Sequence, residues 1–182
     1  MKRIHLIIFF ALPLCFACQE EEVDWENYYA TATLNDVPWE DWPHSQAYYD
    51  KEKNGTLFFR LTKFHYLNGN RNERELIRFR NITFVYDTIK LKFLRPGSGL
   101  VDSIPTVYFN IQDHDATIKT YDLLETDNFD SWLLLERAGT HELKGTFQIA
   151  VKKSIDSPPN TSYRPDTLYF TEGVFLARDV DK

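Results

Sequence analysis

Short segments in which apolar and polar residues alternate with a period of two dominate this sequence. Leu57, Phe59 and Leu61 alternate with Arg60 and Thr62, for example, and similar segments recur along most of the chain. Such alternation places apolar side chains on one face of a strand and polar side chains on the other. No convincing long helical period is present, so the pattern predicts an all-β fold.

Turn signals separate the segments at roughly the 8–12 residue spacing that is typical of sandwiches and barrels. Asn35-Asp36 is a turn pair, and the alternation slips at Asn81, where a bulge or bend is expected. Short connections favour antiparallel pairing. We therefore expect an antiparallel β-sandwich or flattened β-barrel of about nine strands. The expected strands are 28–34, 56–65, 74–80, 106–111, 116–124, 132–136, 142–151 and 167–177, with 82–86 and 89–94 as a hairpin or one long bent strand, and with a loop up to residue 53.

The first residues have the features of a secretory signal. Lys2 and Arg3 precede an apolar stretch over 4–14, which is shorter than the about 20 residues of a membrane-spanning helix. Ala17 directly precedes Cys18, and this end resembles the lipobox of bacterial lipoproteins, although Cys15 stands where Leu is usual. The resemblance implies lipidation of Cys18 and attachment to the membrane through that lipid. An ordinary cleaved signal is the alternative.

These features divide the chain into a signal peptide over 1–17, an acidic tether over 18–27 and a single β domain over 28–182. The run Gln19-Glu20-Glu21-Glu22 resembles the export signal of surface lipoproteins in Bacteroidota. It implies a lipid-anchored protein of the outer membrane, exposed at the cell surface. The other interpretation is a solvated spacer.

Charge and cysteine content exclude some classes of partner and of fold stabilisation. Removing Lys2 and Arg3 from the 21 basic residues leaves 19 against 27 acidic ones, a net charge of −8. This argues against nucleic acid as a partner, because that binding depends on phosphate neutralisation by basic side chains. Both cysteines, Cys15 and Cys18, lie at the signal. The β domain must therefore be stable without disulfides.

Several segments together resemble small Bacteroidota lipoproteins, most of which are families of unknown function. Residues 29–39 resemble their opening motif, an aromatic-x-Ala strand followed by Asn-Gly-x-x-Trp, with Asp36 in place of the Gly. Residues 143–147 and 168–175 resemble their closing pair of strands, with the patterns Gly-x-Phe and Thr-x-Gly-x-Phe. Residues 120–123 resemble a Gly-x-Tyr-x-Leu strand, although Thr120 stands where a small residue is usual. The resemblance implies compartment and fold, and it transfers no catalytic residue.

Two glycines within the closing strands call for a structural explanation. A Gly inside a strand usually marks a bulge or a close backbone approach. We therefore expect Gly145 and Gly173 to lie where two strands approach each other near a bulky ring such as Phe147 or Phe175.

The aromatic residues from 39 to 49 are the best candidates for ligand contact. Trp39 and Trp42 flank two carboxylates, and Tyr48 and Tyr49 follow closely. Aromatic faces can stack on sugar rings, and carboxylates can accept hydrogen bonds from hydroxyl groups. Trp42 is the better candidate of the two tryptophans, because Trp39 belongs to the opening motif and is expected to cap the core.

The sequence offers little for catalysis or for metal binding. Asp113-His114-Asp115 is interpreted as a polar turn rather than a metal site, which needs three or four converging ligands. No Gly-x-Ser-x-Gly, His-Glu-x-x-His or phosphate-binding loop is present. We expect no enzymatic activity, no cofactor and no metal. A carboxylate pair for glycoside cleavage stays open, because such pairs meet in space rather than in sequence.

The leading hypothesis is a lipid-anchored binding module for a glycan, a small ligand or a protein. The alternative is a structural or accessory subunit of an outer-membrane assembly without its own ligand. An exposed aromatic pocket would favour the first hypothesis, and a large exposed apolar patch without a cleft would favour the second.

Overall fold

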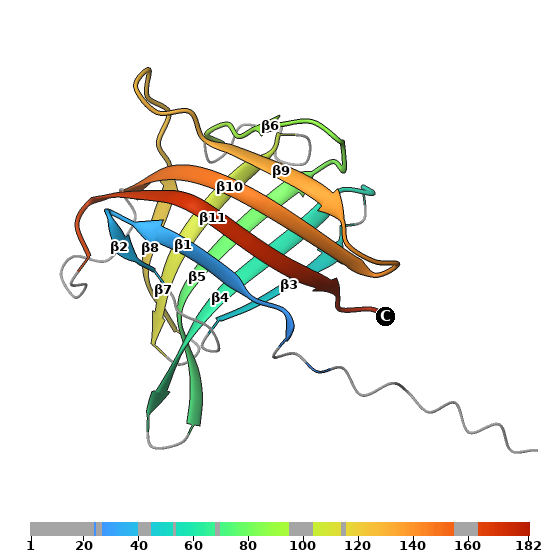
Figure 1. The fold of residues 1–182 in the computed structure, drawn as a ribbon. Coiled ribbons are helices and arrows are strands. Elements are labelled where there is room, and N and C mark those ends of the chain that lie inside the picture. The colour runs from blue at the N-terminus through green and yellow to red at the C-terminus, as the bar shows by residue number, and fades with distance from the viewer. Residues whose placement is uncertain are drawn as a thin grey trace, which may run out of the picture.

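The computed structural model describes residues 24, 27–39, 45–52, 54–67, 70–94, 104–113, 116–154 and 164–182. The described residues form eleven strands (Figure 1). Their bounds are β1 Ala30–Leu34, β2 Val37–Pro38, β3 Ser45–Lys51, β4 Leu57–Leu67, β5 Asn70–Ile82, β6 Ile89–Lys90, β7 Thr106–Asp113, β8 Ala116–Leu123, β9 Trp132–Arg137, β10 Glu142–Lys153 and β11 Thr167–Asp179. The predicted all-β class is confirmed. Within the described part of the chain, no helix is long and apolar enough to cross a bilayer.

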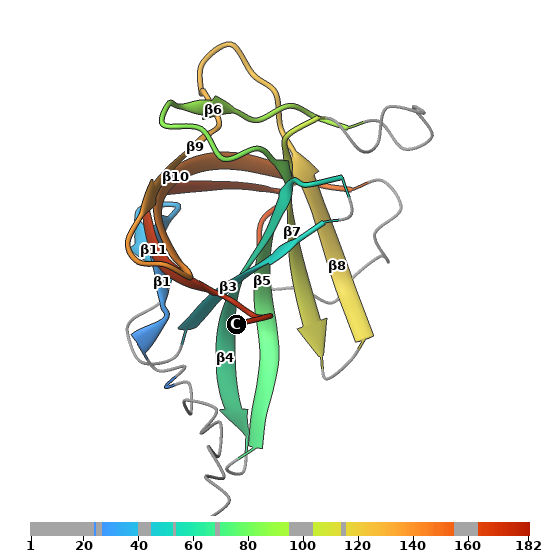
Figure 2. The same cartoon turned by 90° about the vertical axis from the view of Figure 1, so that its right-hand side faces the viewer.

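The strands belong to one sheet that curls back on itself. Its order is β2-β1-β11-β3-β4-β5-β7-β8-β10-β9-β6, and β11 also pairs with β10. The hydrogen-bonded pairings therefore close a circuit from β11 through β3, β4, β5, β7, β8 and β10 back to β11. The curled sheet has two layers whose strands cross. β9, β10, β11 and β1 form one layer, which lies over β3, β4, β5 and β7 (Figures 1 and 2). This arrangement fits the predicted sandwich or flattened barrel.

Most pairings are antiparallel, as the short connections predict. The exception is the parallel pairing of β11 with β3, in which Arg178 lies opposite Tyr48 and Asp179 opposite Tyr49. Along one edge of β11, the earlier residues pair with β1 and the last residues pair with β3. The sheet is therefore mixed, and a single short parallel contact joins its two layers on this side.

The core lies between the two layers and is rich in aromatic rings. Inward-facing residues alternate with more exposed ones along β1, β3, β8, β10 and β11, as period-two patterning requires. Three ring pairs connect β4, β5 and β7 to β10 and β11 at centroid distances of 5.2–5.4 Å, namely Phe59–Phe175, Phe79–Phe147 and Phe109–Phe170. Each such pair contributes about 0.5–1.5 kcal/mol beyond the burial of its area.

The two glycines of the closing strands make room for two of these rings. In the pairing of β10 with β11, Gly145 lies opposite Phe175 and Gly173 lies opposite Phe147. A Cβ added at Gly145 would lie 2.3 Å from Cζ of Phe175, and one at Gly173 would lie 2.5 Å from Cε1 of Phe147. The expected close approach near a bulky ring is therefore confirmed at both positions.

Polar residues in left-handed conformations form the turn and the bend that the sequence predicts. Asn35 and Asp36 have φ angles of 48° and 64° and connect β1 to β2. Two left-handed residues in a two-residue hairpin are the geometry of a type I′ turn, which Asn and Asp tolerate better than most residues. Asn81, where the alternation slips, has a φ of 57°. The predicted bend near the end of β5 is confirmed.

Two local predictions are wrong. The segment up to residue 53, predicted as a loop, contains β3, whose Ala47 and Tyr49 face the core. Two of its three inward positions, Ser45 and Ala47, have small side chains, which concealed the alternation in the sequence. Residues 82–94 form neither a hairpin nor one long strand, because Ile82 ends β5 and only Ile89–Lys90 is a strand after it, which pairs with β9. The polar turn predicted at Asp113-His114-Asp115 begins at the last residue of β7, Asp113, and its other two residues lie outside the described residues.

Candidate binding site on the outer face of the sheet

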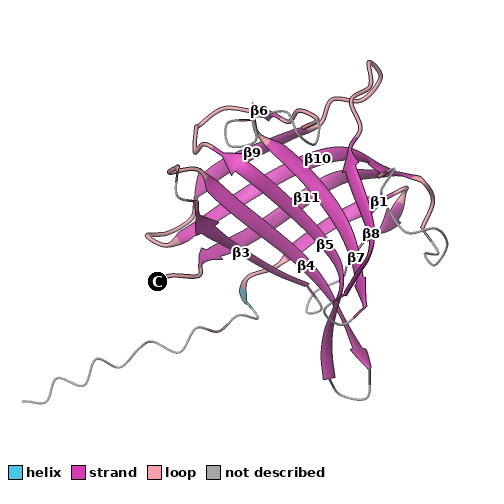
Figure 3. Cartoon of the chain, turned by 180° about the vertical axis from the view of Figure 1, so that it is seen from behind, coloured by secondary structure: helices cyan, strands magenta, loops and turns pink. Residues whose placement is uncertain are grey.

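A pocket of about 390 Å³ opens on the outer face of the layer formed by β3, β4, β5, β7 and β8, whose strands run side by side (Figure 3). Its residues alternate along these strands with the core residues, so they face away from the core. The lining combines two aromatic rings, two guanidinium groups, two carboxylates and two neutral polar side chains: Phe58, Tyr108, Arg78, Arg80, Asp50, Glu52, Asn110 and Thr120.

Strand register places two residues of this pocket, Arg78 and Tyr108, in one row with two neighbours on the same face. Tyr48 on β3 lies opposite Arg60 on β4, Arg60 lies opposite Arg78 on β5, and Arg78 lies opposite Tyr108 on β7. The Arg60 guanidinium carbon lies 5.2 Å from the centroid of the Tyr48 ring, within cation–π range. The row therefore places two cationic groups between two aromatic rings across four neighbouring strands.

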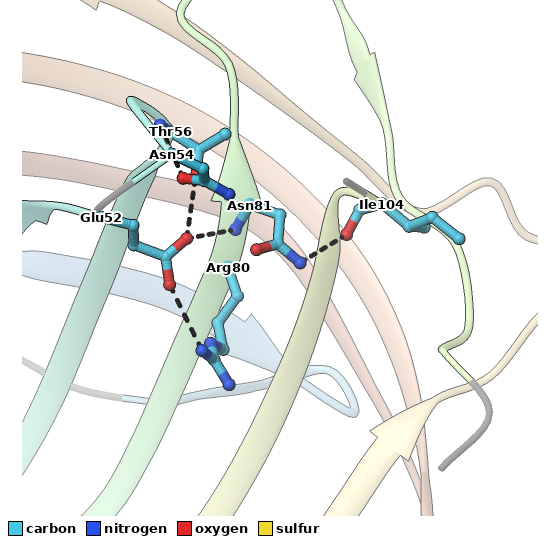
Figure 4. Close-up of polar contacts among 6 residues, drawn as sticks. All are labelled: Glu52, Asn54, Thr56, Arg80, Asn81 and Ile104. Carbon is cyan, nitrogen blue, oxygen red and sulfur yellow. Dashed lines mark hydrogen bonds and ion pairs between the residues drawn. The ribbon is translucent and has the colours of Figure 1, made fainter. Parts of the chain in front are cut away.

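Glu52 fixes one end of the pocket through several hydrogen bonds (Figure 4). Its Oε1 lies 3.4 Å from Nη2 of Arg80, and its Oε2 accepts hydrogen bonds from Oγ1 of Thr56 at 2.8 Å and from the backbone N–H of Asn81 at 3.2 Å. The Asn81 side chain in turn donates to the carbonyl oxygen of Ile104 at 3.1 Å. The left-handed bend at Asn81 turns its N–H toward Glu52, so this network positions Arg80 at the rim.

The opposite end of the pocket is neutral and can both donate and accept hydrogen bonds. Nδ2 of Asn110 donates to Oγ1 of Thr120 at 3.0 Å across β7 and β8. Burial raises the pKa of the Tyr108 phenol above 10.0, the Arg80 charge partly offsets this, and Asp122 adds to it. Tyr108 therefore keeps its proton at neutral pH and can donate a hydrogen bond at the pocket wall.

This composition suits a ligand that has hydroxyl groups and an apolar ring face. Ligand pockets commonly combine aromatic walls with a few polar groups that fix orientation, and their volumes start near 300 Å³. Guanidinium groups and carboxylates form stronger hydrogen bonds than neutral groups do. Among the described residues, no group of three or more His, Cys, Asp or Glu side chains could hold a metal ion.

The structure separates the four aromatic residues that the sequence singled out. Trp39 is 1% exposed and Tyr49 is 5% exposed, so their buried rings leave no face for a ligand to stack on. Trp39 packs edge-on against Phe170, as the cap of the core, and Tyr49 packs against Phe59. Tyr48 is half-buried and belongs to the outer-face row next to the pocket. Trp42 lies outside the described residues, as does Cys18.

Trp39 also belongs to a buried polar cluster. Its Nε1 donates to Oε2 of Glu75 at 2.7 Å, and Glu75 is completely buried. Nε of Arg164 donates to Oε1 of Glu75 at 2.8 Å, and Nη2 donates to Oε2 at 3.2 Å. Nζ of Lys63 donates to the Trp39 carbonyl oxygen at 2.6 Å. These bonds join β4, β5, the end of β2 and the residues before β11.

The residues that line the outer-face pocket are not among the predicted site residues. The alternation places Arg78 and Arg80 opposite Ile77 and Phe79 on the polar face of their strand, but nothing in the sequence distinguishes them from solvent-exposed arginines. One signal was available: Phe58 is a large aromatic residue at a position where the alternation requires a polar one. A single apolar residue on a polar face is ordinary, so this signal alone does not identify a binding site.

Comparison with known proteins finds no matching family model, no matching curated protein and no matching solved structure.

Proposed function

We propose that this protein is a lipid-anchored surface lipoprotein of the outer membrane, and that it acts as a non-enzymatic binding module for a glycan through its outer-face pocket. The observation that carries the binding proposal is the pocket itself, where Phe58 and Tyr108 provide ring faces beside Arg78 and Asp50. The anchor proposal rests on the signal-like residues 1–17, on Ala17-Cys18 and on the acidic run that follows.

The distribution of exposed apolar residues supports a ligand-binding role over the accessory-subunit alternative. The large apolar side chains exposed among the described residues come from β2, the segment after β5, and β11 with its C-terminal end: Val37, Val85, Tyr86, Tyr169, Val174 and Val180. None of them lines the outer-face pocket. Apolar side chains scattered in this way are ordinary on a protein surface, whereas a docking subunit needs a contiguous patch.

Binding of the full chain, purified in detergent, to an array of oligosaccharides tests the proposed ligand class. We expect binding that falls about tenfold or more in Arg78→Ala and in Phe58→Ala, because aromatic and arginine side chains contribute most at binding sites. Arg137→Ala is the matched control, since Arg137 is exposed on β9, where it lies over the ring of Phe84. Equal binding by Arg78→Ala and Arg137→Ala, or no glycan bound by the wild type, would contradict the proposal.

Replacement of Cys18 tests the anchor separately. We expect the wild-type protein to incorporate a labelled fatty acid and to be cleaved by protease added to intact cells. Cys18→Ala should incorporate no label and should leave the membrane fraction, because a membrane attachment through lipid needs the thiol. Retention of the variant in the membrane with an unchanged label would exclude lipidation at Cys18.

A further inference from the structure

We infer that the ligand is a linear, uncharged oligosaccharide of several sugar units that lies across the strands, over the pocket and a second hollow beside it. This inference deepens the proposed function and rests on it. It follows from the position of the second hollow, from the length of the combined surface and from the balance of its charges.

The second hollow has a volume of about 370 Å³ and lies beyond β8. Its lining includes Phe93, Asp122, Glu125 and Lys152. Asp122 lies opposite Tyr108 of the first pocket in the pairing of β7 with β8, and it lies opposite Lys152 in the pairing of β8 with β10. Because paired residues project from the same face of a sheet, the two hollows adjoin at the Tyr108–Asp122 pair.

The combined surface is longer than one sugar ring. It extends from Asp50 on β3 across β4, β5, β7 and β8 to Lys152 on β10. With neighbouring strands about 4.8 Å apart, the five steps give a contour length of roughly 24 Å along the curved outer face, which turns from the layer of β3, β4, β5 and β7 to that of β10. Aromatic side chains occur along it at Phe58, Tyr108 and Phe93. A chain of linked rings can use all three faces, whereas a single ring can use only one hollow.

The charges on this surface are balanced in each half. The first pocket has Arg78 and Arg80 with Asp50 and Glu52. The second has Lys152 and Lys153 with Asp122 and Glu125. A polyanion would meet a carboxylate in each half, and a polycation would meet a basic group, so neither class gains along the whole path. Hydroxyl groups can donate to the carboxylates and accept from the basic groups, which favours an uncharged saccharide chain.

Two of the carboxylates, those of Glu52 and Glu125, already interact with groups of the protein itself. Oε1 of Glu125 accepts a hydrogen bond from the backbone N–H of Phe93 at 2.9 Å, which positions the Phe93 segment at the wall of the second hollow. Glu52 holds Arg80 and the bend at Asn81. Asp50 and Asp122 are therefore the carboxylates in position to accept hydrogen bonds from ligand hydroxyl groups, one in each half of the surface.

The test measures binding of the full chain to size series of linear glucose, mannose and xylose oligosaccharides from monomer to hexamer, with oligogalacturonates as the acidic series. We expect affinity for at least one neutral series to rise about tenfold or more from dimer to hexamer, because additional units reach the second hollow. Phe93→Ala and Lys152→Ala should each lower the affinity for the hexamer toward the affinity for the dimer. The affinity for the dimer itself should stay the same. Lys144→Ala is the matched control, since Lys144 is exposed on β10 outside both hollows.

The possible outcomes distinguish a failure of this inference from a failure of the proposed function. Equal affinity for monomer and hexamer, with both sensitive to Arg78→Ala, would overturn the extended ligand and leave the pocket in place. Stronger binding of the acidic series would overturn the uncharged class. Loss of dimer affinity in Phe93→Ala would place the short ligand in the second hollow and overturn the order of sites. If no series showed binding that depends on Arg78, the proposed function itself would be contradicted.

Discussion

At the scale of single residues, Gly145 is the clearest steric constraint in the fold. A Cβ at this position would lie 2.3 Å from Cζ of Phe175 and 3.0 Å from the Leu134 carbonyl oxygen. We expect Gly145→Ala to lower the free energy of unfolding by about 1–3 kcal/mol, because overpacking of a filled core forces rings off their rotamers. Urea denaturation measures the change, and Gly145→Ala with Phe175→Leu should recover part of the loss.

Gly139→Ala is the control for that experiment. There the added Cβ would lie 2.8 Å from Oε2 of Glu142, the far end of a flexible side chain that can move away. We expect a change within about 0.5 kcal/mol, as for most surface substitutions. If Gly145→Ala were as mild as Gly139→Ala, the close approach of β10 and β11 would not have the steric role assigned to it.

The phenol of Tyr49 gives the fold a pH dependence above neutrality. Burial raises the pKa of Tyr49 above its ordinary value of 10.0, and the nearby Asp179 carboxylate raises it further. As pH rises past 10.0 toward the folded-state pKa, the unfolded chain loses this proton first, so the free energy of unfolding falls with pH. Tyr49→Phe should show a shallower fall in urea denaturation measured across that range. Parallel curves for the two proteins would rule out this contribution.

At the scale of elements, the buried pair of Glu75 and Arg164 joins β5 to the residues before β11. Glu75 is completely buried, while the Arg164 side chain is 24% exposed. Glu75→Gln should destabilise the protein by about 3–5 kcal/mol, because it leaves a cation facing a buried site without its counter-charge. Thermal or urea unfolding measures this loss.

Glu136→Gln is the matched control on an exposed pair. Glu136 lies 2.7 Å from Nζ of Lys144, and both side chains are more than half exposed. An exposed pair of this kind contributes at most about 1 kcal/mol, so the variant should remain close to the wild type. Equal losses in Glu75→Gln and Glu136→Gln would show that burial does not decide the strength of these pairs.

Elements with a continuous alternation could be predicted from the sequence, and elements without one could not. The strands corresponding to β4, β5, β7, β8, β9, β10 and β11 were predicted, because each has several apolar residues two apart. In β3 the inward positions are Ser45, Ala47 and Tyr49, so two small residues conceal the buried face. β6 covers only the first two residues of the strand predicted over 89–94, and its partner β9 lies more than forty positions along the chain, a contact that local patterning does not encode.

At the scale of the whole molecule, the order and register of neighbouring strands create the candidate site. Phe58, Arg78, Tyr108 and Thr120 come from four strands, and only the strand order and register bring them to one pocket. Period-two alternation predicts the two faces of each strand, and short connections predict pairing of consecutive strands, but neither predicts that β5 pairs with β7 to complete the pocket. Of the predicted ligand residues that the structure describes, Tyr48 lies beside the pocket, whereas Trp39 and Tyr49 were predicted by local clustering and are core residues.

Chemical-shift mapping tests most directly whether the outer face of the sheet binds a glycan. The isotopically labelled full chain, in detergent micelles, is titrated with the neutral hexasaccharides. We expect the largest chemical-shift changes at residues 50–52, 58, 78–80, 108–110 and 120–122, with smaller changes at residues 93 and 152–154. Shifts confined to β9, β10 before residue 148 and the exposed side of β11, or no shifts with any hexasaccharide, would contradict glycan binding at the outer face.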